Sequence, residues 1–263
     1  MKIHGKEIKT IITDLDGTLL GSDKKLDPEV FPLIEELEKR GVSFVVASGR
    51  QYNNMKLLFA PILEGLPLVC ENGSQIVKDG ETIYERNIPR DLSFELIADL
   101  LAVPGTETIV SSERNLYTLA DRDEFINYMN EFLHPDMHLV ESYELVTGNI
   151  NKISIWWKDG IPEKEEKWFH EKYDDTLQVV DGGNGWLDFT MKGVNKGTAL
   201  CELAKIEGFS MEETLCFGDS ENDVAMFREC GISYVMETGR EHVKAEADYV
   251  CTNVCDVLRE VLK

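Results

Sequence analysis

The sequence predicts an α/β protein in which an open, largely parallel sheet is interrupted by an inserted α+β domain. Short apolar runs at residues 8–13, 42–47 and 214–217 belong to regions where strand and helix patterns alternate regularly, as in a sheet of buried parallel strands. Between residues 82 and 190 this alternation is lost, and strands follow one another with only two or three helices among them. A chain of 263 residues is long enough for one large or two smaller domains.

The first predicted strand, residues 8–13, ends at a pair of carboxylates. Asp14 and Asp16 are followed by Gly17 and Thr18. Side chains two apart on an extended chain leave from the same face, and open α/β sheets bind ligands at the carboxyl ends of their strands. Two neighbouring anions repel unless a cation or a shared proton relieves them, which indicates a divalent metal, a nucleophile with an acid–base partner, or both. The alternative is a strand that ends in an Asp-Gly turn.

The second predicted strand, residues 42–47, ends at Ser48, Gly49 and Arg50. A hydroxyl, an unhindered backbone amide and a guanidinium together form a donor set suited to anionic oxygens. The alternative for Ser48 is a capping role at the next helix, which is still compatible with phosphate contact.

The middle of the chain is predicted to form a second domain, residues 82–190, inserted into a first domain made of residues 1–81 and 191–263. Hairpin pieces at 74–77 and 82–85 flank its start, joined by a good turn sequence. Helices are expected near residues 92–102, 124–133 and 162–173, and strands near 108–110, 116–119, 138–140, 150–157, 177–180 and 186–190. Six residues of this domain could contact a substrate, although packing or surface roles fit each of them better: Arg114, His134, His138, Trp156, Trp157 and Trp186.

Two more charged segments follow the insertion. Lys196 precedes an amphipathic run, where the helix dipole does not favour a cation, so it is either an ordinary surface residue or a partner for carboxylates and phosphate. The strand at 214–217 ends in Gly218, and Asp219, Asn222 and Asp223 come next, before a helical pattern. Asp223 also suits a helix N-terminus. Two acidic clusters at strand ends, about two hundred residues apart, are hard to explain as caps alone.

These four segments, in this order, resemble the motifs of the haloacid dehalogenase superfamily of phosphotransferases. The motifs are Asp14-x-Asp16-Gly17-Thr18, Ser48-Gly49-Arg50, Lys196 and Gly218-Asp219-x-x-Asn222-Asp223. Within the superfamily the chain is most similar to the Cof-like phosphatases, which share the Asn72-Gly73 pair and the Gly-Val-Asn-Lys-Gly sequence around Lys196. The resemblance implies a Rossmann-like doubly wound core and a type IIB α/β cap at residues 82–190, which closes over the substrate and selects it.

The resemblance also implies a role for each motif residue. Asp14 is the nucleophile that forms an aspartyl-phosphate, and Asp16 is first the general acid and then the base. Mg²⁺ is held by the Asp14 carboxylate, the Asp16 backbone carbonyl and Asp219. Asp223 orients Lys196 or the waters of the metal. The residues expected to hold phosphate or substrate are Thr18, Ser48, Gly49, Arg50, Lys196 and Asn222.

Composition narrows the partners and the compartment. Asp and Glu outnumber Lys and Arg by 49 to 27, a formal charge of −22, which disfavours nucleic acid and anionic membranes as partners. An anionic substrate must therefore be drawn in by local cations. The six cysteines form no zinc pattern and are expected to be reduced thiols. The sequence shows no apolar leader or membrane span, so we expect a cytoplasmic protein. The oligomeric state expected is a monomer or a homodimer.

The resulting prediction is a Mg²⁺-dependent phosphatase of small phosphorylated metabolites, with sugar phosphates the leading class. A phosphomutase would use the same residues, and a non-catalytic phosphometabolite-binding protein could keep the fold. A nucleotide-binding Rossmann protein is the weakest alternative, because no GxGxxG follows the first strand.

Overall fold

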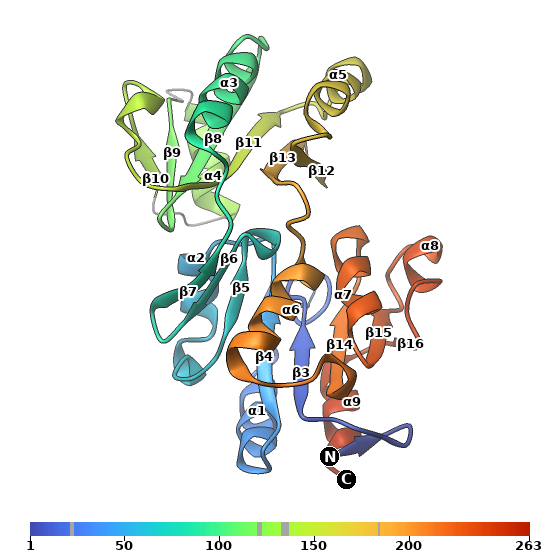
Figure 1. Ribbon diagram of the computed structural model, residues 1–263. Helices are drawn as coiled ribbons and strands as arrows, with labels where there is room; N and C mark the ends of the chain where they lie inside the picture. Colours follow the sequence, from blue (N-terminus) through green and yellow to red (C-terminus); the bar gives the residue numbers. More distant parts are fainter. Residues whose placement is uncertain (22–23, 120–122, 133–136, 184) are drawn as a thin grey trace. The chain divides into compact units, whose positions relative to one another are not determined.

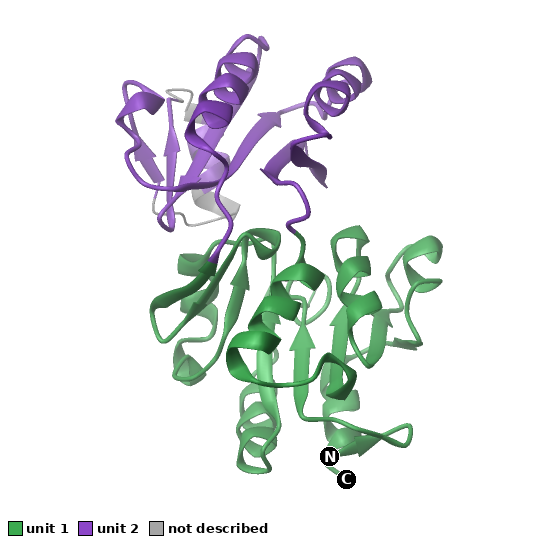
Figure 2. Cartoon of the chain, in the orientation of Figure 1, with its two compact units in different colours: residues 1–84, 195–263 green, residues 85–194 purple. Residues whose placement is uncertain are grey.

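The chain forms two compact units, one of them inserted into the other. The structure is a computed structural model that describes residues 1–21, 24–119, 123–132, 137–183 and 185–263. Unit 1 contains residues 1–84 and 195–263, and unit 2 contains residues 85–194 (Figure 2). The boundaries expected at 82 and 190 fall inside two strands, β7 (Glu81–Glu85) and β13 (Trp186–Met191). They differ from those of the units because β7 continues the sheet of unit 1, whereas β13 lies wholly in the sheet of unit 2.

Unit 1 is built on an eight-stranded sheet with the order β16-β15-β14-β3-β4-β5-β6-β7 (Figure 1). Its other strands are β3 (Thr10–Thr13), β4 (Ser43–Ala47), β5 (Leu68–Cys70), β6 (Gln75–Lys78), β14 (Thr214–Gly218), β15 (Ile232–Met236) and β16 (Tyr249–Cys251). Pairing is parallel from β16 to β5, and β6 is antiparallel to β5. A separate two-stranded ribbon consists of β1 (Lys2–Ile3) and β2 (Lys6–Glu7). Chain order runs outward from β3 on both sides, so β3 lies at the switch point of a doubly wound sheet.

Helices cover both faces of the unit 1 sheet. Ile11 and Ile12, adjacent in β3, are both fully buried but belong to different hydrophobic clusters, as expected when successive side chains point to opposite faces. One face is covered by α1 (Val30–Lys39), α2 (Tyr52–Leu58) and α9 (Val254–Val261), and the other by α6 (Lys196–Glu207), α7 (Val224–Glu229) and α8 (Glu241–Lys244). The predicted fold class, a parallel doubly wound core with an inserted α+β domain, is confirmed.

Unit 2 is a six-stranded sheet with the order β10-β9-β8-β11-β13-β12. The remaining bounds are β8 (Thr106–Ser112), β9 (Asn115–Thr118), β10 (Met137–Leu139), β11 (Ile150–Trp157) and β12 (Leu177–Gly183). Helices α3 (Arg90–Leu101) and α5 (Glu163–Tyr173) pack on one face around Ile155 and Phe189. Helix α4 (Asp123–Phe132) packs on the opposite face, where Phe125 contacts Trp156. No helix in the described ranges is long and apolar enough to cross a membrane.

The aromatic residues considered as substrate contacts are mostly packing residues. Trp156 and Trp157 are buried in two different clusters of unit 2, and Trp186 packs against the first of them. His138 is exposed and stacks on Tyr117. Arg114 occupies a left-handed position between β8 and β9, and His134 lies outside the described residues.

Candidate active site

Three groups of predicted site residues follow three neighbouring strands at the same edge of the unit 1 sheet. In the register of the sheet, Thr13 at the end of β3 is level with Val46 of β4 and Phe217 of β14. Because the three strands are parallel, the segments that begin at Asp14, Ser48 and Asp219 all leave from their carboxyl ends.

Lys196 lies at the centre of the carboxylates. Its side chain is fully buried, and its Nζ donates to Asp14 Oδ1 at 2.5 Å and to Asp223 Oδ1 at 2.7 Å. Asn195 fixes the start of α6 through a capping box with Thr198. An ordinary surface role for Lys196 is excluded, because a buried ammonium requires anionic partners.

Asp223 combines two functions. Its Oδ1 accepts from Lys196, and its Oδ2 accepts from the backbone N–H groups of Asp219 at 2.9 Å and Ser220 at 3.1 Å. The role at a helix start considered from the sequence is therefore confirmed, because Asp223 forms a capping box with Ser220. The same carboxylate also binds Lys196. Asp223 thereby couples the loop after β14 to α6.

The charges of the site are set by burial and by one another. Burial lowers the pKa of Lys196, but the carboxylates of Asp14 and Asp223 outweigh it and raise that pKa above its ordinary value, so the lysine stays protonated. Burial raises the pKa of the Asp14 carboxyl, and Lys196 opposes that rise. Burial, with the nearby Asp223 charge, raises the pKa of Asp219 to about 6. The site thus holds more negative charge than one lysine neutralises.

The carboxylates fit a divalent cation. Asp14, Asp219 and Asp223 each offer an oxygen, and these atoms lie within 4.8 Å of one another. Asp14 Oδ2 and Asp219 Oδ1 are buried and accept no hydrogen bond from the described residues, and such orphaned anionic oxygens are costly without a cation. An all-oxygen donor set is the kind that Mg²⁺ prefers.

Gly17 lets Asp219 approach the first aspartate loop. Gly17 has φ +81°, and a Cβ at this position would lie 2.3 Å from Asp219 Oδ2. A side chain here would both strain the backbone and displace the carboxylate. The glycine therefore brings Asp219 against the backbone that follows Asp16.

The Ser48–Arg50 segment lies beside the aspartates, but Arg50 has an unexpected partner. Its Nε and Nη2 donate to the two carboxylate oxygens of Asp16, at 2.7 and 2.6 Å. The Asp16 side chain is 47% exposed, so this bidentate pair faces solvent. Ser48 is buried, and its Oγ accepts from the Arg50 backbone N–H at 3.1 Å rather than capping α2, whose first turn is preceded by Gln51. Thr18 Oγ1 is buried, with no hydrogen bond to a described residue.

Asn222 is held by two neighbours. Its Nδ2 donates to Asn72 Oδ1 at 3.0 Å, and its Oδ1 accepts from Ser220 Oγ at 2.8 Å. Asn72 belongs to the pair of residues shared with the Cof-like phosphatases, but no role in the site was predicted for it. A signal was present, because Asn72 follows β5, the strand that neighbours β4, and must therefore leave the same edge of the sheet.

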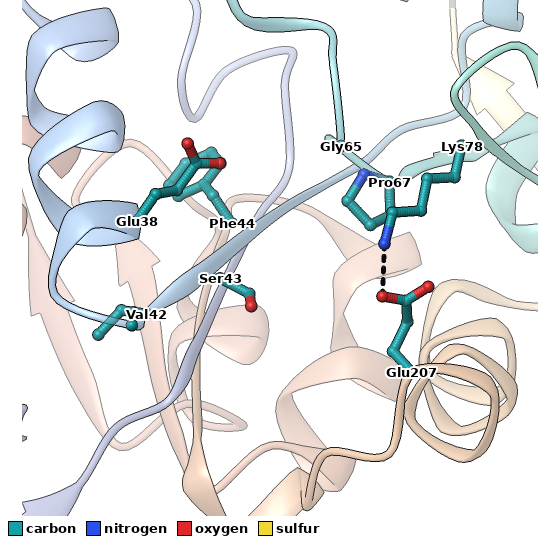
Figure 3. Close-up of a pocket in the computed structure, with 9 residues that line it drawn as sticks. Glu38, Val42, Ser43, Phe44, Gly65, Pro67, Lys78 and Glu207 are labelled. Atoms are coloured by element: carbon teal, nitrogen blue, oxygen red, sulfur yellow. Dashed lines mark hydrogen bonds and ion pairs between the residues drawn. The ribbon is translucent and has the colours of Figure 1, made fainter.

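A surface cavity of about 180 Å³ lies elsewhere on unit 1 (Figure 3). Its lining includes Ser43, the first residue of β4, and Lys78, which pairs with Glu207 at 2.5 Å. Lys196 begins the helix that Glu207 ends, and Ser48 follows the strand that Ser43 begins. The cavity is therefore at the amino end of β4, opposite to the aspartates, and is not part of the candidate site.

The chain is similar to known proteins over almost its whole length. A family model described as haloacid dehalogenase-like hydrolase matches residues 11–258. The chain is 30% identical, over 262 residues and 97% of both chains, to the 5-amino-6-(5-phospho-D-ribitylamino)uracil phosphatase YbjI of Escherichia coli. Among solved structures, SMU.1108c of Streptococcus mutans is similar with a TM-score of 0.86 and 28% identity, covering 97% of this chain and 99% of that one. The subclass IIB sugar phosphatase BT4131 is similar with a TM-score of 0.81 and 25% identity, covering 96% and 98%.

Proposed function

The chain belongs to the haloacid dehalogenase-like hydrolases and is a phosphatase, and from that premise we propose that it hydrolyses small phosphorylated metabolites with Mg²⁺ through an aspartyl-phosphate. The observation that carries the proposal is the state of Asp14. One carboxylate oxygen is bound by the buried Lys196, while the other is buried without a partner among the described residues. A carboxylate held in this way is oriented for in-line attack on phosphorus, since positioning is most of what phosphoryl transfer requires.

In the first half-reaction, Asp14 forms a bond to phosphorus as the bond to the leaving oxygen breaks, and Asp16 protonates that oxygen. In the second, Asp16 accepts a proton from water, which attacks the aspartyl-phosphate and regenerates Asp14. Asp16 has to carry a proton in the first step, so its pair with Arg50 must open. A phosphoryl group competes for the guanidinium, because phosphate oxygens accept the same bidentate hydrogen bonds.

The remaining residues neutralise and orient the phosphoryl group. Ser48, the Gly49 amide, Lys196 and Asn222 supply donors, and Thr18 contributes its buried hydroxyl. Asp14, the backbone carbonyl of Asp16 and Asp219 would hold Mg²⁺, which when bound supplies positive charge to the transferred phosphoryl oxygens. Asp223 keeps Lys196 in place.

We propose sugar phosphates as the leading substrate class and unit 2 as the specificity domain. The subclass IIB relative BT4131 is a sugar phosphatase, and the E. coli relative acts on a phosphorylated ribityl compound. Both relatives are thus named for a phosphate on a sugar or on a sugar-derived ribityl group. The six cysteines all carry free thiols, which favours the reducing cytoplasm as the compartment.

The test is a phosphate-release screen over phosphorylated metabolites, with Mg²⁺ and with EDTA. It includes hexose and pentose phosphates, 5-amino-6-(5-phospho-D-ribitylamino)uracil and phosphorylated amino acids. We expect release from sugar phosphates with Mg²⁺ and none with EDTA. Isomer formation in place of phosphate release would identify a phosphomutase, and a panel without any release would indicate a phosphometabolite-binding protein. The Asp16→Ala variant should be slower by about 10²–10⁴-fold, the usual contribution of general acid–base catalysis.

A further inference from the structure

The turn after β5 has an unusual backbone. Glu71, Asn72 and Gly73 are three consecutive residues with positive φ, at 52°, 55° and 100°. Left-handed backbone is unfavourable for residues that carry a Cβ, and it persists only where the surrounding structure holds it. The contacts of this turn show what holds it.

Two backbone hydrogen bonds join the turn to the Ser48–Arg50 segment. The Glu71 N–H donates to the Arg50 carbonyl at 3.0 Å, and the Asn72 N–H donates to the Ser48 carbonyl at 3.0 Å. The Asn72 side chain also lies against Gly49, where a Cβ would be 3.1 Å from Asn72 Oδ1. The turn therefore packs against the Ser48–Arg50 segment, whose donors are proposed to bind phosphate.

The same turn reaches the two other site segments. Asn72 Oδ1 accepts from Asn222 Nδ2, in the loop after β14. A Cβ on Gly73 would lie 2.4 Å from the carbonyl oxygen of Asn195, the residue before Lys196. Three segments that are distant in sequence thus meet on three consecutive residues.

We propose that Asn72 is a positioning residue that fixes the Asn222 amide and the Ser48–Arg50 segment relative to each other, and so sets the affinity for the phosphoryl group. A primary amide has two N–H donors and one carbonyl oxygen. Asn222 uses one donor on Asn72 and its oxygen on Ser220, which leaves one N–H for a ligand. Asn72 decides where that N–H points. The inference rests on the proposed function, in which Asn222 and Ser48 hold phosphoryl oxygens.

The test variant is Asn72→Gly. Glycine adopts positive φ without strain, so the turn is kept while the amide oxygen that anchors Asn222 is lost. The two measurements are turnover of p-nitrophenyl phosphate with Mg²⁺, and calorimetric binding of inorganic phosphate to the Mg²⁺-loaded protein. We expect KM and the phosphate Kd to rise together by about 3–10-fold, the effect of one lost hydrogen bond. The kcat should stay within about twofold, because ground state and transition state lose the same contact.

A double-mutant cycle separates positioning from a general structural effect. In the Asn222→Ala background, Asn72→Gly should change KM and Kd by less than about twofold, because residues that act as a unit are not additive. The matched control is Asp79→Gly. Asp79 also has positive φ, at 50°, and its Oδ1 accepts one hydrogen bond, from Gly65 N–H at 2.7 Å, in the turn between β6 and β7. This control should leave KM and Kd unchanged.

The outcomes distinguish the inference from the function on which it rests. Unchanged KM and Kd in Asn72→Gly, with or without a loss of kcat, would overturn the positioning role. A full effect of Asn72→Gly in the Asn222→Ala background would overturn it as well. A wild-type protein without turnover would refute the proposed function, and the phosphate Kd would then decide the inference alone. Equal Kd values for wild type and Asn72→Gly, or no phosphate binding by wild type, would count against it.

Discussion

Replacing Lys196 by methionine tests the arrangement of the site most directly. Methionine keeps an unbranched apolar side chain but removes the charge, so Asp14 and Asp223 are left facing each other in a buried environment. Removing one partner of a buried ion pair costs about 3–5 kcal/mol of unfolding free energy. At roughly 2–4 °C per kcal/mol for a chain of this size, the melting temperature should fall by ~6–20 °C.

The two units allow an informative assay. All four tryptophans, Trp156, Trp157, Trp168 and Trp186, lie in unit 2, so tryptophan fluorescence follows that unit, whereas far-ultraviolet circular dichroism follows both. The Lys196→Met variant should shift the circular dichroism transition to lower urea concentration. Because the lesion is in unit 1, the fluorescence transition should shift no further than the circular dichroism transition.

Two companion variants make the result specific. Adding Asp223→Asn to Lys196→Met removes one of the two unpaired carboxylate charges and keeps a side-chain oxygen that accepts from the backbone N–H groups of Asp219 and Ser220. The double variant should recover at least half of the lost unfolding free energy without regaining activity. Lys205→Met, on the exposed side of the same helix, should leave the midpoint unchanged. A Lys196→Met protein that unfolds within about 1 kcal/mol of wild type would refute the buried-pair argument.

Three further outcomes follow from the structure. Asp14→Asn keeps the side-chain shape but removes the nucleophilic charge, so phosphate release should stop while the circular dichroism spectrum is unchanged; residual turnover well above background would contradict the nucleophile assignment. Gly17→Ala places a methyl group against Asp219, so the stabilisation of the wild-type fold by Mg²⁺, measured as a melting-temperature difference with and without EDTA, should shrink in the variant. An equal Mg²⁺ effect in both proteins would argue against a metal at these carboxylates. Burial raises the pKa of the Cys251 and Cys255 thiols to about 11 from an ordinary 9.0, so the unfolded chain releases their protons first. The free energy of unfolding should therefore fall as pH rises from 9 to 11. The difference in this free energy between wild type and the Cys251→Ala/Cys255→Ala variant should become smaller over the same pH range. Urea titrations at several pH values measure both quantities.

The positions of the chemical groups along the sheet could be predicted from the sequence because parallel strands leave little choice. Each buried strand reads as a short apolar run, and the residue after it must emerge at the carboxyl edge. Asp14, Ser48 and Asp219 were assigned on that basis, and the structure brings all three to one edge. The α+β order of the insertion was readable for the same reason, since strand and helix periodicities differ.

The partners of the polar side chains could not be predicted, because they depend on the path of loops. Arg50 was expected to bind phosphate, yet its guanidinium pairs with the Asp16 carboxylate. Asp16 lies in a loop, and loop conformation produces no periodic pattern in the sequence. Asn72 contacts Asn222 only because three residues accept left-handed backbone, a choice that propensity alone disfavours. Tertiary contacts stabilise such locally unfavourable conformations, and these conformations are commonest at functional sites.

The chain returns from unit 2 to unit 1 immediately before Lys196. Unit 2 ends at Val194, unit 1 resumes at Asn195, and the next residue is the ammonium donor between the two aspartates. A single peptide bond, between Val194 and Asn195, therefore separates unit 2 from the capping box of α6. An insert grafted onto this scaffold should keep Asn195 and Thr198, because their capping box fixes the start of the helix that carries Lys196.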